Sequence, residues 1–314
     1  MNILCATDNN YAQHCYIMLL SLFDNNASNQ IDAYILVSNL SNENEAILKN
    51  LPTKALHKVH LIEVEDKLEN CPIREGDHVS IVTYYRILAP TLLPNTIDKI
   101  LYLDVDMIVC KDISDLYNSN IDGYAIGAIL DSDYYSAIDK YERLLYPSSL
   151  KYINAGVLLI NLAYWRDNKI MDECLEFIRK YPERCLFHDQ DTINYVLRDR
   201  KQLLPLKYNF QTGFIRTDSI VEAQIKQEVY KVIQEKSYAI IHYTFDKPWN
   251  ANFNPYRGYY LHYKKLSPYA KVLVPKQSTI WHLKRWTYNI CAFIGLVKPI
   301  STYIVKNDKL KFNN

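Results

Sequence analysis

Five acidic side chains follow or interrupt apolar stretches that are typical of buried strands. Asp8 comes after "NILCAT", Asp104 and Asp106 interrupt "ILYLDVDMIV", and Asp131 and Asp133 come after "AIGAIL". In parallel α/β sheets, ligands bind beyond the carboxyl ends of the strands. We therefore expect these carboxylates to meet at one edge of a sheet and to hold a ligand there.

Asp104 and Asp106 are the most informative pair. Alternate residues of an extended strand point the same way, so both carboxylates are expected on one face. Two like charges in a partly buried site are costly unless a cation compensates them. Carboxylate oxygens suit Mg²⁺ and Mn²⁺, which commonly hold substrate phosphates as well. The alternative is that one aspartate caps a turn and the other pairs with a lysine or an arginine.

A metal-held phosphate would replace a glycine-rich loop, which this chain lacks. It has 7 glycines in 314 residues and contains neither GxGxxG nor GxxxxGK[ST]. The formal net charge is +1, so the chain as a whole gives no reason to expect nucleic-acid binding.

Two other stretches carry polar residues in unusual places. Asn154 and Gly156 stand before an apolar run in "NAGVLLINL". Gly156 would allow close backbone approach, although a strand entered through a turn explains the glycine equally well. In "FHDQDTINYVL", Gln190 can hydrogen-bond a sugar hydroxyl, whereas Asp189 and Asp191 suit the first turn of a helix, where they interact with its dipole.

The stretch "AIIHYTFDKPWN" ends an apolar strand with a histidine. His242 can be a metal ligand, or a hydrogen-bonded structural histidine. Lys247 can meet a phosphate as a point charge, and Trp249 can simply pack.

Alternating strand and helix patterns predict an α/β fold with a mostly parallel central sheet. A hydrophobic fraction of 49% allows one large domain. Proline-containing 252–260 and 267–278 suggest irregular structure. Ser41 is expected to cap its helix. Strands are expected over 2–7, 31–39, 58–65, 99–109, 123–133, 155–165 and 238–245, and helices over 11–25, 41–51, 81–94 (ending near Pro90), 168–181, 189–197 and 222–235.

Cysteine usage and the N-terminus indicate a reducing compartment. The 7 cysteines are odd in number and include no CxxC pair, which argues against a disulfide framework or a structural zinc site. "MNILCATDNN" lacks the basic and apolar regions of a signal peptide, and no apolar run reaches the roughly 20 residues of a membrane span. A cytoplasmic location is expected.

Six ordered motifs together resemble glycosyltransferase family 8, the retaining nucleotide-sugar transferases. They are "ATDNNY", "HVSIVTYYR", "LYLDVDMIV", "NAGVLLINL", "HDQDTIN" and "IIHYTFDKPWN", and they span residue 1 to about 250. The branch that looks most similar is the bacterial lipopolysaccharide galactosyltransferases and glucosyltransferases. The resemblance implies a GT-A (Rossmann-like) catalytic domain over 1–275, a UDP-sugar donor and Mn²⁺, with Mg²⁺ as a substitute.

The resemblance also implies roles for individual residues. The metal would be held by Asp104, Asp106 and His242, with Val105 between the two aspartates also in the donor site. Ala6, Thr7, Asp8, Asn10 and Tyr11 would hold the uridine and ribose. Val79 would lie near the nucleotide, Arg86 near the donor sugar and diphosphate, and Lys247 on the diphosphate. The sugar would be held by Asn154, Ala155, Asp189 and Gln190, and His78 and Asp131 would border the acceptor.

The physical chemistry fits this assignment. Negative charge develops on the departing UDP, where a metal and Lys247 would stabilise it. Retaining hydrolases use a carboxylate nucleophile, but the residue expected beside the anomeric carbon is Gln190, a poor nucleophile. We therefore favour attack by the acceptor on the same face, with Asp189 and Gln190 as the catalytic residues that orient the sugar.

One departure from the family pattern follows His242. The family usually has a glycine and a longer loop before Lys-Pro-Trp, whereas "HYTFDKPW" has Phe245 and is one residue shorter. A backbone amide near the diphosphate is then missing or displaced, which makes the role of Lys247 less secure than that of the aspartates. Thr7 is a milder variation.

The C-terminal tail, 276–314, mixes aromatic, aliphatic and basic residues. This mixture suits a small helical tail that lies on an anionic membrane surface, at the inner face of the cell membrane. A helix docked on the catalytic domain explains it equally well.

The leading reading is a metal-dependent transferase that moves galactose or glucose from a UDP-sugar to a glycan acceptor, such as lipopolysaccharide or another surface glycan that is lipid-linked or protein-linked. A glycogenin-like self-glucosylating protein is an alternative, since the chain has 27 tyrosines. A nucleotidyltransferase could also use paired aspartates. A catalytically degenerate nucleotide-sugar-binding protein would agree with the altered loop after His242.

Overall fold

The computed structural model of the chain describes residues 1–51, 56–65, 68, 71–73, 80–132, 138–216, 222–250, 254–274, 286, 287 and 305. His78, Val79 and Asp133 lie outside these residues, as does nearly all of the tail 276–314.

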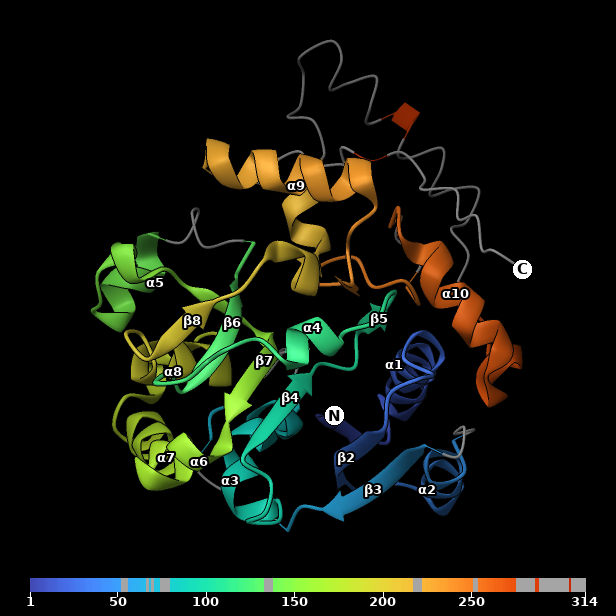
Figure 1. Cartoon of the computed structure of the whole chain (residues 1–314), viewed down its shortest axis with the longest axis horizontal. Coiled ribbons are helices and arrows are strands. Elements are labelled where there is room, and N and C mark those ends of the chain that lie inside the picture. The colour runs from blue at the N-terminus through green and yellow to red at the C-terminus, as the bar shows by residue number, and fades with distance from the viewer. Residues whose placement is uncertain are drawn as a thin grey trace.

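A seven-stranded sheet in the order β3-β2-β1-β4-β7-β6-β8 forms the centre of the molecule (Figure 1). Its strands are β1 (Asn2–Asp8), β2 (Ile31–Ser38), β3 (His57–Glu63), β4 (Lys99–Leu103), β6 (Ile126–Leu130), β7 (Ile153–Asn161) and β8 (Lys201–Leu203). Every neighbouring pair is parallel except those of β7, which runs antiparallel to both β4 and β6. The prediction of an α/β fold with a mostly parallel sheet is confirmed.

The reversed direction of β7 positions the site. Its first residues lie at the same edge of the sheet as the carboxyl ends of β4 and β6, because Leu103 pairs with Val157 and Leu130 with Ile153. Asn154 is the second residue of this strand, so it faces the edge at which the strand-end aspartates gather.

Helices surround the sheet in two groups (Figure 1). Helix α1 packs on β1 and against α10, and α2 packs on β3; α6 and α8 pack on β7. The hydroxyl of Ser41 accepts a hydrogen bond from the Asn44 N–H at 3.2 Å, which confirms the predicted cap of α2. The helices are α1 (Ala12–Asn25), α2 (Asn42–Lys49), α3 (Ala89–Leu92), α4 (Ser114–Tyr117), α5 (Ile138–Leu144), α6 (Leu162–Asp167), α7 (Ile170–Lys180), α8 (His188–Val196), α9 (Ala223–Glu235) and α10 (Arg257–Leu266).

The continuous strand predicted over 99–109 is wrong. The chain leaves the main sheet after Leu103, bends through 104–106 and enters a second, three-stranded sheet. That sheet has the order β5-β10-β9 and consists of β5 (Met107–Val109), β10 (Ile240–His242) and β9 (Phe210–Gln211). The two aspartates therefore lie in a bend between two sheets, and strand alternation is not what orients them.

Two prolines do not have the effect that the sequence predicts for them. The predicted helix over 81–94 is a 3₁₀ helix (Ile81–Leu88) followed by α3, and Pro90 does not end it. Pro90 stands in the first turn of α3, where a missing N–H costs nothing. In the described part of 252–260, Pro255 stands two residues before α10 begins at Arg257, and that helix buries Tyr260 and Tyr263.

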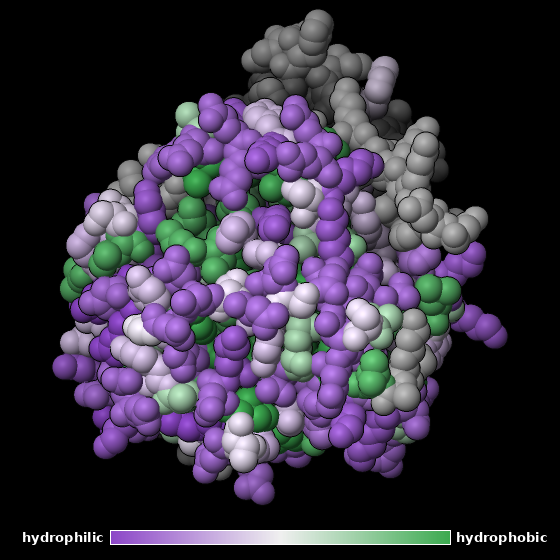
Figure 2. Space-filling view, viewed as in Figure 1, coloured by the Kyte–Doolittle hydropathy of each residue, from purple (hydrophilic) through white to green (hydrophobic). Residues whose placement is uncertain are grey.

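The surface in view is mostly polar, with apolar side chains in small patches (Figure 2). Within the part of the chain that the structure describes, no helix is both long enough and apolar enough to span a bilayer.

Candidate functional site

A cleft of about 770 Å³ lies at the edge of the sheet where β1, β4 and β6 end and β7 begins. Most of the predicted site residues line it: Ala6, Thr7, Asp8, Tyr11, Arg86, Asp104, Val105, Asp106, Asp131, Asn154, Gln190, His242 and Lys247. Asp189 and Ala155 are buried behind the lining, and Asn10 is exposed outside it.

Asp104, Asp106 and His242 meet on the floor of the cleft. One ligand atom from each lies within 4.8 Å of the others. The His242 Nε2 atom is 3.2 Å from Asp106 Oδ1 and 3.9 Å from Asp104 Oδ2. Two carboxylate oxygens and one imidazole nitrogen form a donor set that suits Mn²⁺ or Mg²⁺.

Each aspartate also pairs with a cation through its other oxygen. Arg86 Nη2 lies 3.0 Å from Asp104 Oδ1, and Lys247 Nζ donates to Asp106 Oδ2. Burial alone would raise the pKa of Asp106, but Lys247 and His242 outweigh it and hold that pKa below its usual range. Each carboxylate therefore pairs with a basic residue through one oxygen and faces His242 through the other. The expected pairing with basic residues and the expected metal site are compatible for this reason.

The hydrogen-bond network fixes which nitrogen of His242 is free. The Gly156 N–H donates to Asn154 at 3.0 Å, so that atom of Asn154 must be its amide oxygen. Asn209 Nδ2 donates to the same oxygen at 2.9 Å, which turns Asn209 Oδ1 toward His242 Nδ1, also at 2.9 Å. Nδ1 therefore donates to Asn209, and Nε2 is the nitrogen that faces the carboxylates and is available to a cation. The residues present fit a divalent cation.

Gly156 is where β7 passes closest to this cluster. A Cβ atom at this position would lie 2.5 Å from His242 Cε1 and 2.7 Å from Asp104 Oδ2. The Gly156 carbonyl also accepts the Asp104 N–H at 2.9 Å. The expected close backbone approach at Gly156 is confirmed, and it occurs at the cluster of Asp104, Asp106 and His242.

Arg86 connects the cluster of Asp104, Asp106 and His242 to Asp189. Its Nε is 2.9 Å from Asp189 Oδ2, and its guanidinium lies 4.2 Å from the centre of the Tyr102 ring. Burial raises the pKa of Asp189, and Arg86 and the Thr83 hydroxyl, which donates at 2.5 Å, oppose that rise. In this geometry Asp189 acts on the cleft through Arg86.

Gln190 lines the cleft with its amide held on both sides. Its Oε1 accepts the Ala155 N–H at 2.9 Å, and its Nε2 donates to Asp131 Oδ2 and to the Tyr152 hydroxyl, both at 3.3 Å. Asn154 Nδ2 also donates to Asp131 Oδ2, at 3.1 Å. Gln190, Asn154 and Asp131 thus form one connected group of polar side chains.

The β1 end of the cleft is shaped by a turn and by aromatic rings. Asp8 Oδ1 accepts the N–H groups of Asn10 and Tyr11 at 2.9 and 3.0 Å, so this carboxylate stabilises its own turn. Trp249 lines the cleft and stacks on His14, with 3.6 Å between the ring centres. Burial lowers the pKa of His14 to about 3.

Sequence reasoning missed the residues at the opposite end. Lys140 on α5 and Phe187 before α8 line the cleft beyond Asp131, and Phe245 lines it beside Ser132. No motif marks Lys140 in the sequence, and Phe187 stands directly before "HDQDTIN" without any feature that singles it out. Phe245 had a signal, its departure from the family pattern, but not one that placed its ring in the cleft.

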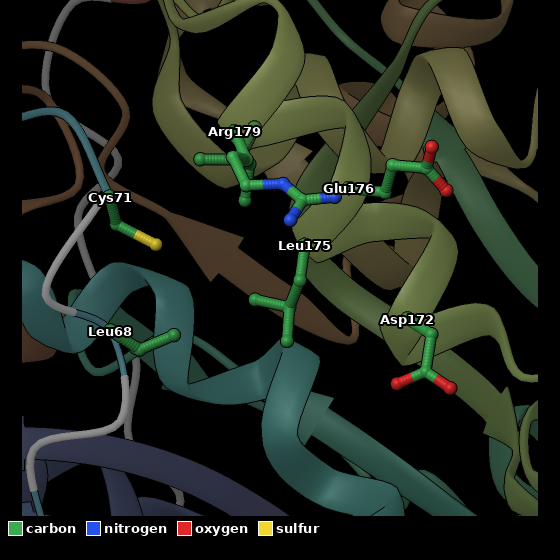
Figure 3. A pocket seen from close by; sticks show the side chains of 7 residues that line it. Leu68, Cys71, Asp172, Leu175, Glu176 and Arg179 are labelled. Carbon is green, nitrogen blue, oxygen red and sulfur yellow. The ribbon is translucent and has the colours of Figure 1, made fainter.

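A second cavity, of about 370 Å³, lies against α7 (Figure 3). Leu68 and Cys71 line one side, and Asp172, Leu175, Glu176, Ile178 and Arg179 of α7 line the other. It contains none of the residues that the motifs single out, so the larger cleft is the candidate active site.

Comparisons with known proteins agree with this geometry. The sequence model of Glycosyl transferase family 8 matches residues 2–252. General stress protein A of Bacillus subtilis (strain 168) is 28% identical over 269 residues, which cover 84% of this chain and 92% of that protein. The Lipopolysaccharide 1,2-glucosyltransferase of Escherichia coli (strain K12) is 27% identical over 256 residues, covering 80% and 73%.

A solved structure is similar over nearly the whole chain. The crystal structure of galactosyltransferase LgtC in complex with donor and acceptor sugar analogs matches with a TM-score of 0.74 and 24% identity. The match covers 90% of this chain and 100% of that one, and it confirms the expected GT-A fold.

Proposed function

Because the chain belongs to glycosyltransferase family 8, we propose that it transfers galactose or glucose from a UDP-sugar to a hydroxyl of a glycan, with retention of the anomeric configuration. The observation that carries this proposal is the cluster of Asp104, Asp106 and His242 on the floor of a cleft large enough for a nucleotide sugar. Ligand pockets in proteins usually measure about 300–1,000 Å³.

Asp104 Oδ2, Asp106 Oδ1 and His242 Nε2 would hold Mn²⁺ or Mg²⁺. When bound, the cation supplies positive charge that neutralises the donor diphosphate. Lys247 adds a second positive charge beside Asp106, and Arg86 adds a third, buried one beside Asp104. Ala6, Thr7 and Tyr11 at the end of β1 would border the nucleoside, because nucleotides bind at that edge of such sheets.

In the proposed reaction, the bond between the anomeric carbon and the β-phosphate oxygen breaks, and its electron pair leaves with UDP. The acceptor hydroxyl oxygen bonds to the anomeric carbon from the same face, and its proton passes to the departing phosphate oxygen. Gln190 would orient the sugar through an amide that four neighbours hold, and Asp189 would act through Arg86. A covalent hexosyl adduct trapped on Asp189 would contradict this course.

A surface glycan is the acceptor we propose. Support comes from the name of the Escherichia coli relative, a lipopolysaccharide glucosyltransferase. A self-glucosylating protein would instead gain the mass of hexosyl units when it is incubated with the donor alone.

The test follows UDP release from a panel of UDP-sugars with Mn²⁺, comparing wild type, Asp106→Asn and the control Asp122→Asn, an exposed aspartate outside the cleft. We expect slow hydrolysis of one donor in wild type and in Asp122→Asn, and a loss of about 100-fold or more in Asp106→Asn. Release of pyrophosphate would indicate a nucleotidyltransferase. Tight UDP binding without any turnover would favour the degenerate binding protein.

A further inference from the structure

Asp191 is the acidic residue of "HDQDTIN" whose role the cleft leaves unexplained. Its side chain is fully buried and does not line the cleft. Asp191 Oδ2 accepts hydrogen bonds from Arg143 Nη1 at 2.8 Å and from the Phe187 N–H at 2.6 Å, and Arg143 Nη2 donates to Oδ1 at 3.2 Å. A buried carboxylate that is paired with a guanidinium in this way is a fixed hydrogen-bond acceptor.

Tyr152 is held by this carboxylate. Its side chain is fully buried, and its hydroxyl donates to Asp191 Oδ1 at 2.7 Å. Burial, with Asp191 and Asp131 nearby, raises the pKa of Tyr152 well above its ordinary value, so the hydroxyl keeps its proton. Because a carboxylate has no hydrogen to donate, the hydroxyl hydrogen must point to Asp191, and only the lone pairs of the Tyr152 oxygen remain for another neighbour.

That neighbour is the amide of Gln190. Its Nε2 donates to the Tyr152 oxygen and to Asp131 Oδ2, both at 3.3 Å. Its Oε1 accepts from the Ala155 N–H at 2.9 Å and from Asn154 Nδ2 at 3.3 Å. Both hydrogens of Nε2 and both lone pairs of Oε1 therefore have partners. A flipped amide would turn Oε1 toward a carboxylate and toward an oxygen whose hydrogen already points elsewhere, so the network specifies this orientation.

Gln190 is connected to His242 through two asparagines. Asn154 Nδ2 donates to Gln190 Oε1, Asn209 Nδ2 donates to Asn154 Oδ1 at 2.9 Å, and Asn209 Oδ1 lies 2.9 Å from His242 Nδ1. The Gly156 N–H also donates to Asn154 Oδ1, at 3.0 Å. Asn154 therefore keeps its orientation without the tyrosine hydroxyl, so loss of that hydroxyl should loosen Gln190 and leave His242 in place.

We propose that Tyr152 is a positioning residue, whose hydroxyl, fixed by Asp191, orients the Gln190 amide before the donor sugar arrives. This assignment rests on the proposed function, in which Gln190 orients the sugar. Tyr152 does not line the cleft, so it acts only through Gln190. A dipole that is oriented in advance lowers the activation barrier because it needs no rearrangement during the reaction.

The first test compares Tyr152→Phe with the control Tyr146→Phe. Each variant loses one buried hydroxyl beside α8, but that of Tyr146 donates to Asn194 Oδ1 at 3.5 Å and is not among the partners of Gln190 in the part of the chain that the structure describes. UDP release from the hydrolysed UDP-sugar is followed with Mn²⁺. We expect Tyr152→Phe to lower kcat about tenfold with the KM for the UDP-sugar within about twofold, and Tyr146→Phe to change neither. Equal kcat values in Tyr152→Phe and wild type would overturn the proposal.

Two further readouts separate positioning from structural damage. In a Gln190→Ala background the amide is gone, so adding Tyr152→Phe should lower kcat no further. The affinity for Mn²⁺, measured by isothermal calorimetry, should stay within about twofold of wild type in Tyr152→Phe, because an outer partner of a ligand changes metal affinity about 10–100-fold and Tyr152 is not one. A further tenfold loss of kcat in the double variant, or a Mn²⁺ affinity that falls together with kcat, would mean that Tyr152 only supports the fold.

A last measurement needs no turnover. NMR of full-length protein labelled with ¹⁵N-glutamine reads the Gln190 side-chain amide, which the loss of its signals in Gln190→Ala assigns. We expect its hydrogens to exchange with water about tenfold faster in Tyr152→Phe than in wild type or Tyr146→Phe. This result without UDP release from any donor would defeat the proposed function alone, whereas UDP release with unchanged exchange in Tyr152→Phe would defeat the positioning role alone.

Discussion

The two ends of the cleft differ in how their charged side chains are paired. At the donor end, Asp104 and Asp106 are already paired with Arg86 and Lys247. At the end opposite β1, Lys140 has no hydrogen-bonding partner among the described residues, and Phe187 is exposed. One end therefore holds charges that are balanced within the protein, whereas the other presents an exposed aromatic ring and an ammonium group whose donors the described residues do not use.

The largest effect is expected from the balanced charges. Arg86→Met would leave the buried carboxylate of Asp189 and the partly buried one of Asp104 without their shared cation. The free energy of unfolding should fall by about 3–5 kcal/mol in a urea titration. The control Lys49→Met breaks an exposed pair with Glu45 and should cost less than about 1 kcal/mol. Equal losses in the two variants would remove the contrast between the ends.

The next effect concerns metal binding. Asn209→Ala removes the acceptor that keeps the proton on His242 Nδ1, and such outer partners are worth about 10–100-fold in metal affinity. Mn²⁺ titration by isothermal calorimetry measures it. Asn168→Ala is the control, since Asn168 is exposed and bonds only within its own helix turn. Unchanged Mn²⁺ affinity in Asn209→Ala would show that the imidazole needs no such partner.

A pH effect of intermediate size belongs to the donor end. The pKa of His14 is lowered to about 3, mainly by burial, while Asp106 raises it and Lys247 lowers it more weakly. The unfolded chain therefore binds a proton below its usual pKa of about 6.5 that the folded chain does not, so stability falls as the pH falls. Between pH 7 and 5 this amounts to about 2 kcal/mol.

His14→Gln should lack this acid-dependent loss, although it also loses the stack on Trp249. Urea unfolding of both proteins at several pH values gives the difference curve. Parallel curves for wild type and variant would mean that His14 titrates normally.

The smallest effect is expected at Phe245, which lines the cleft beside Ser132. Its ring is 36% exposed, and the guanidinium of Arg216 lies 4.4 Å from its centre. Phe245→Ala should raise the KM for a methyl glycoside about threefold, the size of one partly exposed aromatic contact. A larger change in the Kd for UDP than in this KM would place Phe245 at the donor end.

The donor end could be anticipated because its residues stand in short, separate motifs at the ends of apolar strands. The sequence does not show why the side chains of Asp104 and Asp106 lie close together. The run "ILYLDVDMIV" is apolar on both sides of the aspartates, and nothing in it shows that Leu103 ends one sheet while Met107 begins another. Helix α10 was hidden because Pro255 marks the turn before a helix as readily as it marks a loop.

The residues at the end opposite β1 could not be predicted from the sequence for a different reason. Lys140, Phe187 and Phe245 are brought together by tertiary contacts across more than 100 residues, and each is an ordinary residue in its own segment. His78 and Val79, which the family resemblance places in the site, lie outside the described residues. Their roles, and the membrane contact predicted for the tail, stay predictions.

The closeness of Gly156 to Asp104 and His242 has a consequence for how the cleft can open. The strand that carries Gly156 bonds Asp104 through its carbonyl and abuts the His242 ring, and the neighbouring Ala155 N–H holds Gln190. These contacts restrain the spacing between the Asp104–Asp106–His242 cluster and the Gln190 amide. We therefore expect any opening that admits substrate to involve the walls of the cleft more than this floor.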